Sequence, residues 1–385
     1  MTRRERQSQT PLELGRAAYE RVQASRGEQR KRTRSGAEPR DQRSVLITGI
    51  GNYWGGRVAL ALEQESSVGE LLGMDVSGPV TSFSRLEYIH MSLRSPFLAD
   101  MLRHRRVDTV VHMEWREPDR GPEKMFETNV MGTRALLSAC KEAGVRKLIV
   151  RSSTAVYGPS SDNPNFLPER YPVRARARDP HIRDQVECES DYKEFLSHRH
   201  PKPILSVLRF AHIVGPGAPS AMNRFLRRRT LQGVMGYDPL LQFIHENDMV
   251  AAVVAAVQRD VAGAVNVAAD GVVPLTRVAR LLGKRLRHNV LALVPALEQV
   301  ASYLPRAAKP AVPSSYLRFL CNGDTKRMKD ELGFTPRMNA VETLRTFGGS
   351  PVDDGDMLGR SAPGYEEYVQ RCLDEVLEKE EPRGA

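Results

Sequence analysis

Short apolar, β-branched segments alternate with amphipathic segments from Ser44 onward, and this alternation constrains the fold more than any other feature. The expected strands span 44–48, 71–76, 86–91, 107–113, 147–152 and 204–214. The expected helices between them span 55–64, 96–105 and 124–144. Repeated strand–helix–strand units with right-handed crossovers put helices on both faces of a parallel sheet. The sequence therefore predicts an α/β fold with a doubly wound parallel sheet, whose ligands bind at the carboxyl ends of the strands.

The distribution of charge divides the 385 residues into three parts. Residues 1–43 carry twelve Lys and Arg against six Asp and Glu, whereas residues 351–385 carry four against ten. We predict a basic, disordered extension over 1–43 and one α/β domain over 44–345, with a smaller C-terminal substrate lobe from about residue 205. An acidic tail with one helix would follow over 346–385. A basic arm can also bind nucleic acid or an acidic membrane, but no nucleic-acid-binding motif accompanies this one.

Several classes of protein are disfavoured by what the sequence lacks. It has no run of about 18 apolar residues, so we expect no transmembrane helix. Its N-terminus is charged and has no apolar core, unlike a secretory signal. The cysteines lie without metal-ligand spacing, at Cys140, Cys188, Cys321 and Cys372. We therefore expect reduced thiols in a cytoplasmic protein, with no metal site.

A glycine-rich turn follows the first expected strand and opens the first expected helix, in the sequence T-G-I-G-N-Y-W-G-G over residues 48–56. A dinucleotide turn needs glycines for the bend, for close approach to the pyrophosphate and for packing of helix on strand. Gly49 and Gly55 hold the two outer positions, and Asn52 holds the middle one. Asparagine tolerates left-handed backbone angles, although its side chain takes space. The place of this turn in the chain predicts a nucleotide site.

Asp75 ends the second expected strand, about 25 residues after the turn. An acidic residue in this position accepts hydrogen bonds from the adenosine ribose and repels a 2′-phosphate, which favours NAD over NADP. An aspartate that merely caps the end of a strand is the alternative.

Five further segments occur in the order found in the extended short-chain dehydrogenase/reductase superfamily. They are Asn129–Cys140, Ser152–Gly158, Leu208–Pro216, Phe243–Val250 and Asp324–Pro336. Over roughly residues 44–345 the chain therefore resembles this superfamily, and within it the NAD-dependent epimerase/dehydratase proteins similar to UDP-glucose 4-epimerase. The resemblance implies a Rossmann fold, an NAD cofactor, a nucleotide-sugar-like substrate and a homodimer formed through the helix that contains Asn129.

The resemblance also implies roles for single residues. Gly49, Asn52 and Gly55 would cradle the pyrophosphate, and Asp75 would hold the adenosine ribose. Ser153 matches the catalytic Ser or Thr of the family.

Two segments of the expected cofactor site depart from the family pattern. Ser92 stands where the family usually has an aspartate near the adenine. His112 begins the segment that lines the cofactor, and there Glu114 and Trp115 replace two small residues.

The chain lacks the family's Tyr-x-x-x-Lys pair, in which Lys lowers the Tyr pKa and Tyr exchanges a proton with the substrate. Aligning on Glu189 places His181 at the Tyr position and Gln185 at the Lys position. His181 could act as an acid or base, with Arg183 as a fixed charge. Alternatively, His181 is a surface or helix-capping histidine in a site without the standard chemistry.

Three functional hypotheses follow from the sequence. The first is an NAD-dependent epimerase/dehydratase-type protein that acts on a nucleotide sugar or a related substrate. The second is a non-catalytic NAD-binding regulatory or scaffold protein that has lost the proton-transfer pair. The third is a protein tethered to membrane or nucleic acid by its basic arm.

Overall fold

A computed structural model describes residues 43–79, 81–116, 122–175, 180–197, 203–289 and 312–347. The chain divides into two units, residues 1–348 and 349–385, and everything described belongs to the first. The predicted basic extension, apart from Arg43, and all but the first two residues of the predicted acidic tail lie outside the described residues. Both therefore stay predictions.

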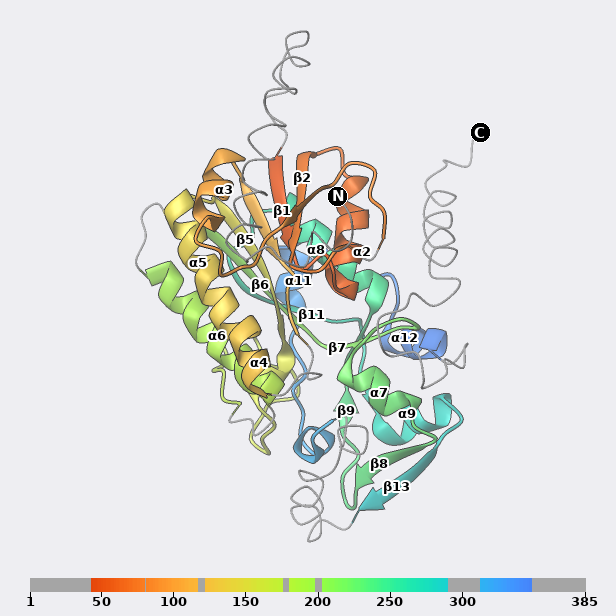
Figure 1. The fold of residues 1–385 in the computed structure, drawn as a ribbon. Helices are drawn as coiled ribbons and strands as arrows, with labels where there is room; N and C mark the ends of the chain where they lie inside the picture. The colour runs from red at the N-terminus through yellow and green to blue at the C-terminus, as the bar shows by residue number, and fades with distance from the viewer. Residues whose placement is uncertain are drawn as a thin grey trace. The chain divides into compact units, whose positions relative to one another are not determined.

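A seven-stranded sheet with all neighbours parallel forms the centre of the fold, in the order β11-β6-β5-β4-β1-β2-β3 (Figure 1). The strands are β1 (Arg43–Thr48), β2 (Val68–Asp75), β3 (Glu87–His90), β4 (Thr109–His112), β5 (Lys147–Ser153), β6 (Ile204–Phe210) and β11 (Gly263–Val267). Their central residues are buried on both sides, as the continuous apolar runs predict for a parallel sheet. The doubly wound fold class is confirmed.

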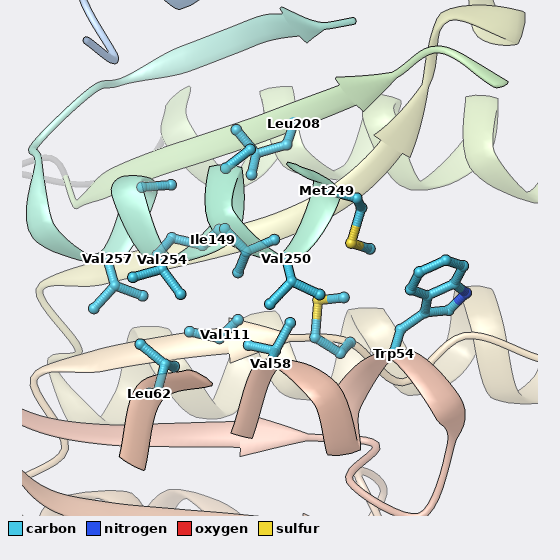
Figure 2. Packing of buried hydrophobic residues seen from close by; sticks show 14 of the residues in the cluster. Trp54, Val58, Leu62, Val111, Ile149, Leu208, Met249, Val250, Val254 and Val257 are labelled. Carbon is cyan, nitrogen blue, oxygen red and sulfur yellow. The ribbon is translucent and has the colours of Figure 1, made fainter. Parts of the chain in front are cut away.

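Helices cover both faces of this sheet and bury one apolar cluster on each. On one face lie α2 (Tyr53–Glu63), α8 (Glu246–Gln258) and α11 (Lys326–Asp330). On the other lie α3 (Leu98–His104), α5 (Gly132–Ala143) and α6 (Pro180–Ser197). Figure 2 shows how Val58 and Leu62 of α2 meet Val254 and Val257 of α8 over the strands. Each such side chain contributes roughly 1.5–3 kcal/mol by burial, so the sheet is a firm base for the loops at its edge.

The strand order reverses between β1 and β4. The chain runs outward from β1 through β2 to β3, and then returns to place β4 on the other side of β1. Thr48 and His112 end these two strands directly opposite each other in the register. Ligands of doubly wound sheets bind in the crevice outside such a switch point. The glycine-rich turn and the segment after β4 both start there.

A smaller lobe is built from segments that alternate with parts of the main sheet. It contains β7 (His212–Val214) paired with β10 (Phe243–His245), β8 (Thr230–Val234) paired with β13 (Arg285–Asn289), and β9 (Leu240–Leu241) paired with β12 (Val273–Pro274). Its helices are α7 (Ala221–Arg227), α9 (Leu275–Leu281) and α12 (Ala340–Phe347), which share a third apolar cluster. The predicted single strand over 204–214 is wrong, because β6 ends at Phe210 and β7 pairs in a different sheet.

Two further properties concern the described part of the chain. No helix there is long and apolar enough to cross a membrane. Cys140, Cys188 and Cys321 are free thiols there, and Cys372 lies outside it. Burial raises the pKa of the Cys188 and Cys321 thiols to about 12, which makes them poor nucleophiles and poor metal ligands.

Candidate functional site

The turn between β1 and α2 is tight because two of its glycines allow no side chain. Gly49 has φ +76°, a left-handed conformation that glycine adopts without strain. A Cβ on Gly55 would lie 2.1 Å from the carbonyl oxygen of Gly49, so helix and strand approach as closely as their backbones permit. These are the bend and the close packing that a dinucleotide turn requires.

Asn52, at the middle position of the turn, stabilises the turn through its side-chain hydrogen bonds. Its backbone is extended, with φ −104°, so the left-handed angle considered for it is not used. Its Oδ1 accepts a hydrogen bond from the N–H of Gly55 at 2.9 Å, which caps α2. Its Nδ2 donates to the carbonyl oxygen of Met113 at 2.9 Å, which ties the turn to the segment after β4. In the described part of the chain no acceptor takes the N–H of Trp54, the second residue of α2.

Asp75 lies at the end of β2, directly against the turn. Its side chain is buried, and its Oδ2 accepts the N–H of Gly51 at 3.0 Å while its Oδ1 accepts the N–H of Ser77 at 2.8 Å. A carboxylate oxygen can accept two hydrogen bonds, so both oxygens keep capacity for a ligand hydroxyl. The predicted ribose-binding residue is therefore held firmly beside the turn.

His112 and Ser92 lie in different surroundings. The ring of His112 is buried, with Nδ1 2.7 Å from the hydroxyl of Thr48 and Nε2 3.0 Å from that of Thr133. Burial lowers the pKa of His112 to about 4, so the ring is neutral near pH 7 and joins β1, β4 and α5. Ser92 follows β3 as an exposed residue that accepts the N–H of Arg94 at 3.3 Å. Contact of either residue with a cofactor stays a prediction.

The segment after β4 is fixed by a residue whose role the sequence did not reveal. Asn129 is fully buried in a single π-helical turn, Glu127–Met131, that precedes α5. Its Oδ1 accepts the N–H of Arg116 at 2.8 Å, and its Nδ2 donates to the carbonyl oxygen of Arg116 at 3.1 Å. This paired contact holds the backbone beside Glu114 and Trp115. Such π-helical turns are frequent at functional sites, but no spacing in the sequence indicates one here.

The residues at the positions of the missing Tyr-x-x-x-Lys pair form a cluster with Trp115. His181 and Gln185 lie one turn apart on α6, and the indole Nε1 of Trp115 donates to Nδ1 of His181 at 3.1 Å. An indole nitrogen only donates, so Nδ1 carries no hydrogen and Nε2 of the neutral ring does.

The orientation of the Gln185 amide follows from this tautomer. Its Nε2 lies 3.5 Å from Nε2 of His181, which would set two donors against each other, and its Oε1 is buried without a partner. Exchanging the amide oxygen and nitrogen resolves the first conflict, because Oε1 then accepts from Nε2–H of the imidazole. The amide nitrogen then takes the buried position. The cluster thus runs from Trp115 through His181 to Gln185.

Ser153 ends β5 next to a buried ion pair that fastens α6 to the sheet. Its Oγ accepts the N–H of Ala155 at 3.1 Å. The neighbouring hydroxyl of Ser152 donates to Glu189 of α6 at 2.6 Å, and Glu189 accepts from Arg209 of β6 at 2.9 Å. The structure thereby brings the end of β5 and the helix of His181 together at the carboxyl edge of the sheet.

The turn fits a dinucleotide at its adenosine and pyrophosphate end. The closely packed glycines, the N–H of Trp54 at the start of α2 and the carboxylate of Asp75 are the groups that such a ligand needs. The other end of the site departs from the standard chemistry, since a neutral imidazole and an amide replace a phenol and an ammonium. In the described part of the chain, no three His, Cys, Asp or Glu side chains gather as a metal site would require.

The sequence also matches a known family and several known proteins. The model of the family described as "NAD dependent epimerase/dehydratase family" matches residues 45–268. An uncharacterized protein of Mycobacterium tuberculosis is 29% identical over 321 residues, which cover 80% of this chain and 84% of that protein. A UDP-glucose 4-epimerase of Yersinia enterocolitica is 27% identical over 186 residues, covering 45% of this chain and 54% of the epimerase.

Solved structures share the fold. MoeE5 in complex with UDP-glucuronic acid and NAD has a TM-score of 0.59 at 23% identity, covering 79% of this chain and 97% of MoeE5. The UDP-glucose 4-epimerase of Thermotoga maritima, solved with UDP-glucose, has a TM-score of 0.60 at 18% identity, covering 86% of this chain and 99% of the epimerase.

Proposed function

The chain belongs to the NAD-dependent epimerase/dehydratase family, and from this premise we propose that it is an NAD-dependent enzyme of epimerase/dehydratase type that acts on a nucleotide sugar. The observation that carries the proposal is the turn, in which Gly49, Gly55 and Asp75 keep the arrangement of a dinucleotide site. Relatives named as UDP-glucose 4-epimerases, and similar folds solved with UDP-sugars and NAD, support the substrate class.

Each end of the site has its own task in this proposal. The start of α2 would hold the pyrophosphate through backbone N–H groups, and Asp75 would accept hydrogen bonds from the adenosine ribose. When bound, NAD supplies a group that accepts a hydride and returns it. Ser153 would orient a substrate hydroxyl.

His181 would act on the substrate in place of the family tyrosine. As a neutral ring that carries its hydrogen on Nε2, it can donate a hydrogen bond to a sugar oxygen if Gln185 gives way. Full proton transfer also requires Trp115 to release Nδ1, because an imidazolium carries hydrogen on both nitrogens. Catalysis through His181 therefore needs both neighbours to move.

The role of His181 can be tested by substitution in the purified protein with NAD and a panel of UDP- and dTDP-sugars. We expect His181→Ala to lower kcat by about a hundredfold to ten-thousandfold, the range for loss of a general acid or base. The exposed Lys193→Ala on the same helix is the matched control and should leave kcat unchanged. Product formation is followed by chromatography of the sugar nucleotides.

The same experiment separates an enzyme from a non-catalytic NAD-binding protein. If the natural protein binds NAD but turns over no sugar nucleotide, while His181→Tyr with Gln185→Lys does, the proposal of catalysis is wrong. The chain would then be an NAD-binding protein that has lost its proton-transfer pair.

A further inference from the structure

Glu114 is a buried carboxyl group without a partner at the cofactor turn. Its exposed fraction is 8%, yet in the described part of the chain no hydrogen bond or ion pair engages its carboxyl group. Burying an acid in this way costs free energy unless a ligand or a proton completes it. Its carboxyl oxygens still touch solvent, so a ligand at the turn can reach them and complete the acid.

The backbone of Glu114 packs directly on the glycine-rich turn. A Cβ placed on Gly49 would lie 2.5 Å from Cα of Glu114, and Asn52 bonds to the carbonyl oxygen of the preceding Met113. The segment cannot swing away easily, because Asn129 clamps both backbone groups of Arg116. The backbone of Glu114 is thus held beside the part of the turn that would receive the pyrophosphate.

Burial and the charge of Asp75 disfavour the ionised form of Glu114. Burial, followed by the nearby negative charge of Asp75, raises the pKa of Glu114 to about 7, and Arg116 opposes this shift only in part. His112, which ends the adjacent strand, stays neutral through this range, since burial lowers its pKa to about 4. A pyrophosphate would add negative charge beside the two carboxyl groups, so it favours protonated Glu114 further.

We infer that Glu114 is a cofactor-binding residue that takes up a proton from solvent when the dinucleotide binds and donates it in a hydrogen bond to a phosphate oxygen. The inference rests on the NAD binding proposed above. It makes binding of the cofactor a proton-coupled step, because Glu114 that is ionised in the free protein becomes a carboxylic acid in the complex. A protonated carboxyl group is a donor, whereas phosphate oxygens only accept.

The direction of the pH dependence follows from linkage. Binding raises the pKa of Glu114 above its value in the free protein, so affinity is greatest below pH 7 and falls as pH rises through 7. With a free pKa of about 7, the Kd for NAD should rise about tenfold from pH 6 to pH 8. At pH 7, binding should take up about half a proton.

Calorimetric titration of the full chain with NAD tests this inference, in buffers with different heats of ionisation at pH 6, 7 and 8. Glu114→Gln is the matched variant, because its amide can still donate to a phosphate but does not titrate. We expect its Kd to be independent of pH and its proton uptake to be zero. Glu114→Ala, which restores the small side chain of the family, should also lose the pH dependence.

Three outcomes would overturn the inference. The first is NAD binding by the natural chain with no proton uptake and a constant Kd. The second is a pH dependence that persists in Glu114→Gln. The third is binding by Glu114→Ala alone, which would mean that Glu114 excludes the cofactor. Absence of NAD binding in all three proteins at every pH would instead refute the proposed function on which the inference rests.

Discussion

Gly55→Ala is expected to reduce NAD affinity by more than about a hundredfold, because it displaces the turn that receives the pyrophosphate. The added Cβ would stand 2.1 Å from the oxygen and 2.6 Å from the carbon of the Gly49 carbonyl, and 3.0 Å from the nitrogen of Ile50. All three atoms belong to the backbone, so no side chain can turn aside to make room. Strand β1 and helix α2 must separate, and the loss of close packing should also cost about 1–3 kcal/mol of stability.

The matched control for this substitution is Gly78→Ala. Gly78 is exposed, and a Cβ there would meet no atom within 4 Å. NAD titration and urea unfolding of both variants would separate the two effects. If Gly55→Ala binds NAD as tightly as the natural chain, the turn does not hold the cofactor.

Glu189→Ala is expected to lower the free energy of unfolding by about 3–5 kcal/mol, because it leaves the buried guanidinium of Arg209 without its counter-ion. Both side chains of this pair are 4% exposed. Arg209 also donates to the hydroxyl of Tyr157 at 2.9 Å and to the carbonyl oxygen of Glu169 at 3.0 Å, and these neutral acceptors remain. Burial lowers the pKa of Arg209, and in the natural chain the carboxylate of Glu189 outweighs this effect. An arginine keeps its charge at any pH that the protein tolerates, so the variant leaves a buried cation.

The control for the buried pair is an exposed one. Arg103 and Glu142 form an ion pair with side chains 47% and 62% exposed, so Glu142→Ala should cost less than about 1 kcal/mol. Urea unfolding measures both losses. A second test is the double variant Glu189→Leu with Arg209→Met, which should be more stable than Glu189→Ala alone, since it removes the stranded charge. If Glu189→Ala and Glu142→Ala lower the free energy of unfolding equally, this account is contradicted.

Glu189 also connects stability to the site. It lies on α6 one turn after Gln185 and two turns after His181, and it receives the hydroxyl of Ser152 at the end of β5. The buried pair therefore positions the helix that carries His181 and Gln185. Weakening the ion pair between Glu189 and Arg209 should therefore displace His181 before the sheet itself unfolds.

Local pattern was sufficient to predict six of the seven strands of the main sheet, but it did not predict β11 or the covering helices α6 and α8. Each predicted strand is a short segment rich in apolar residues and α5 is amphipathic, so these signals lie within a few neighbouring residues. Helix α8 is buried at most of its positions and therefore lacks a clear amphipathic pattern. The glycine-rich turn and Asp75 could also be predicted from the sequence, because the turn directly follows its strand and Asp75 ends the next one. The family was recognised from ordered motifs and is confirmed by the family match over residues 45–268.

The features that the sequence did not predict depend on contacts between distant segments. Strand β6 ends at Phe210 because His212 pairs with Phe243 in another sheet, and the local sequence pattern does not indicate that pairing. Trp115 and His181 are 66 positions apart, so their hydrogen bond required the fold. Glu114 could be recognised as large for its position, but only the structure shows that its buried carboxyl group has no partner.

Binding of NAD to the full chain is the most direct test of the central claim, that the turn between β1 and α2 is a working dinucleotide site. Both tryptophans of the chain, Trp54 and Trp115, belong to this site, so their fluorescence reports on it directly. We predict saturable quenching by NAD, with weaker binding of NADP because Asp75 repels its 2′-phosphate. Asp75→Ala should weaken NAD binding and bring the Kd values of NAD and NADP closer together. Unchanged fluorescence at millimolar NAD, with no heat of binding in calorimetry, would contradict the claim.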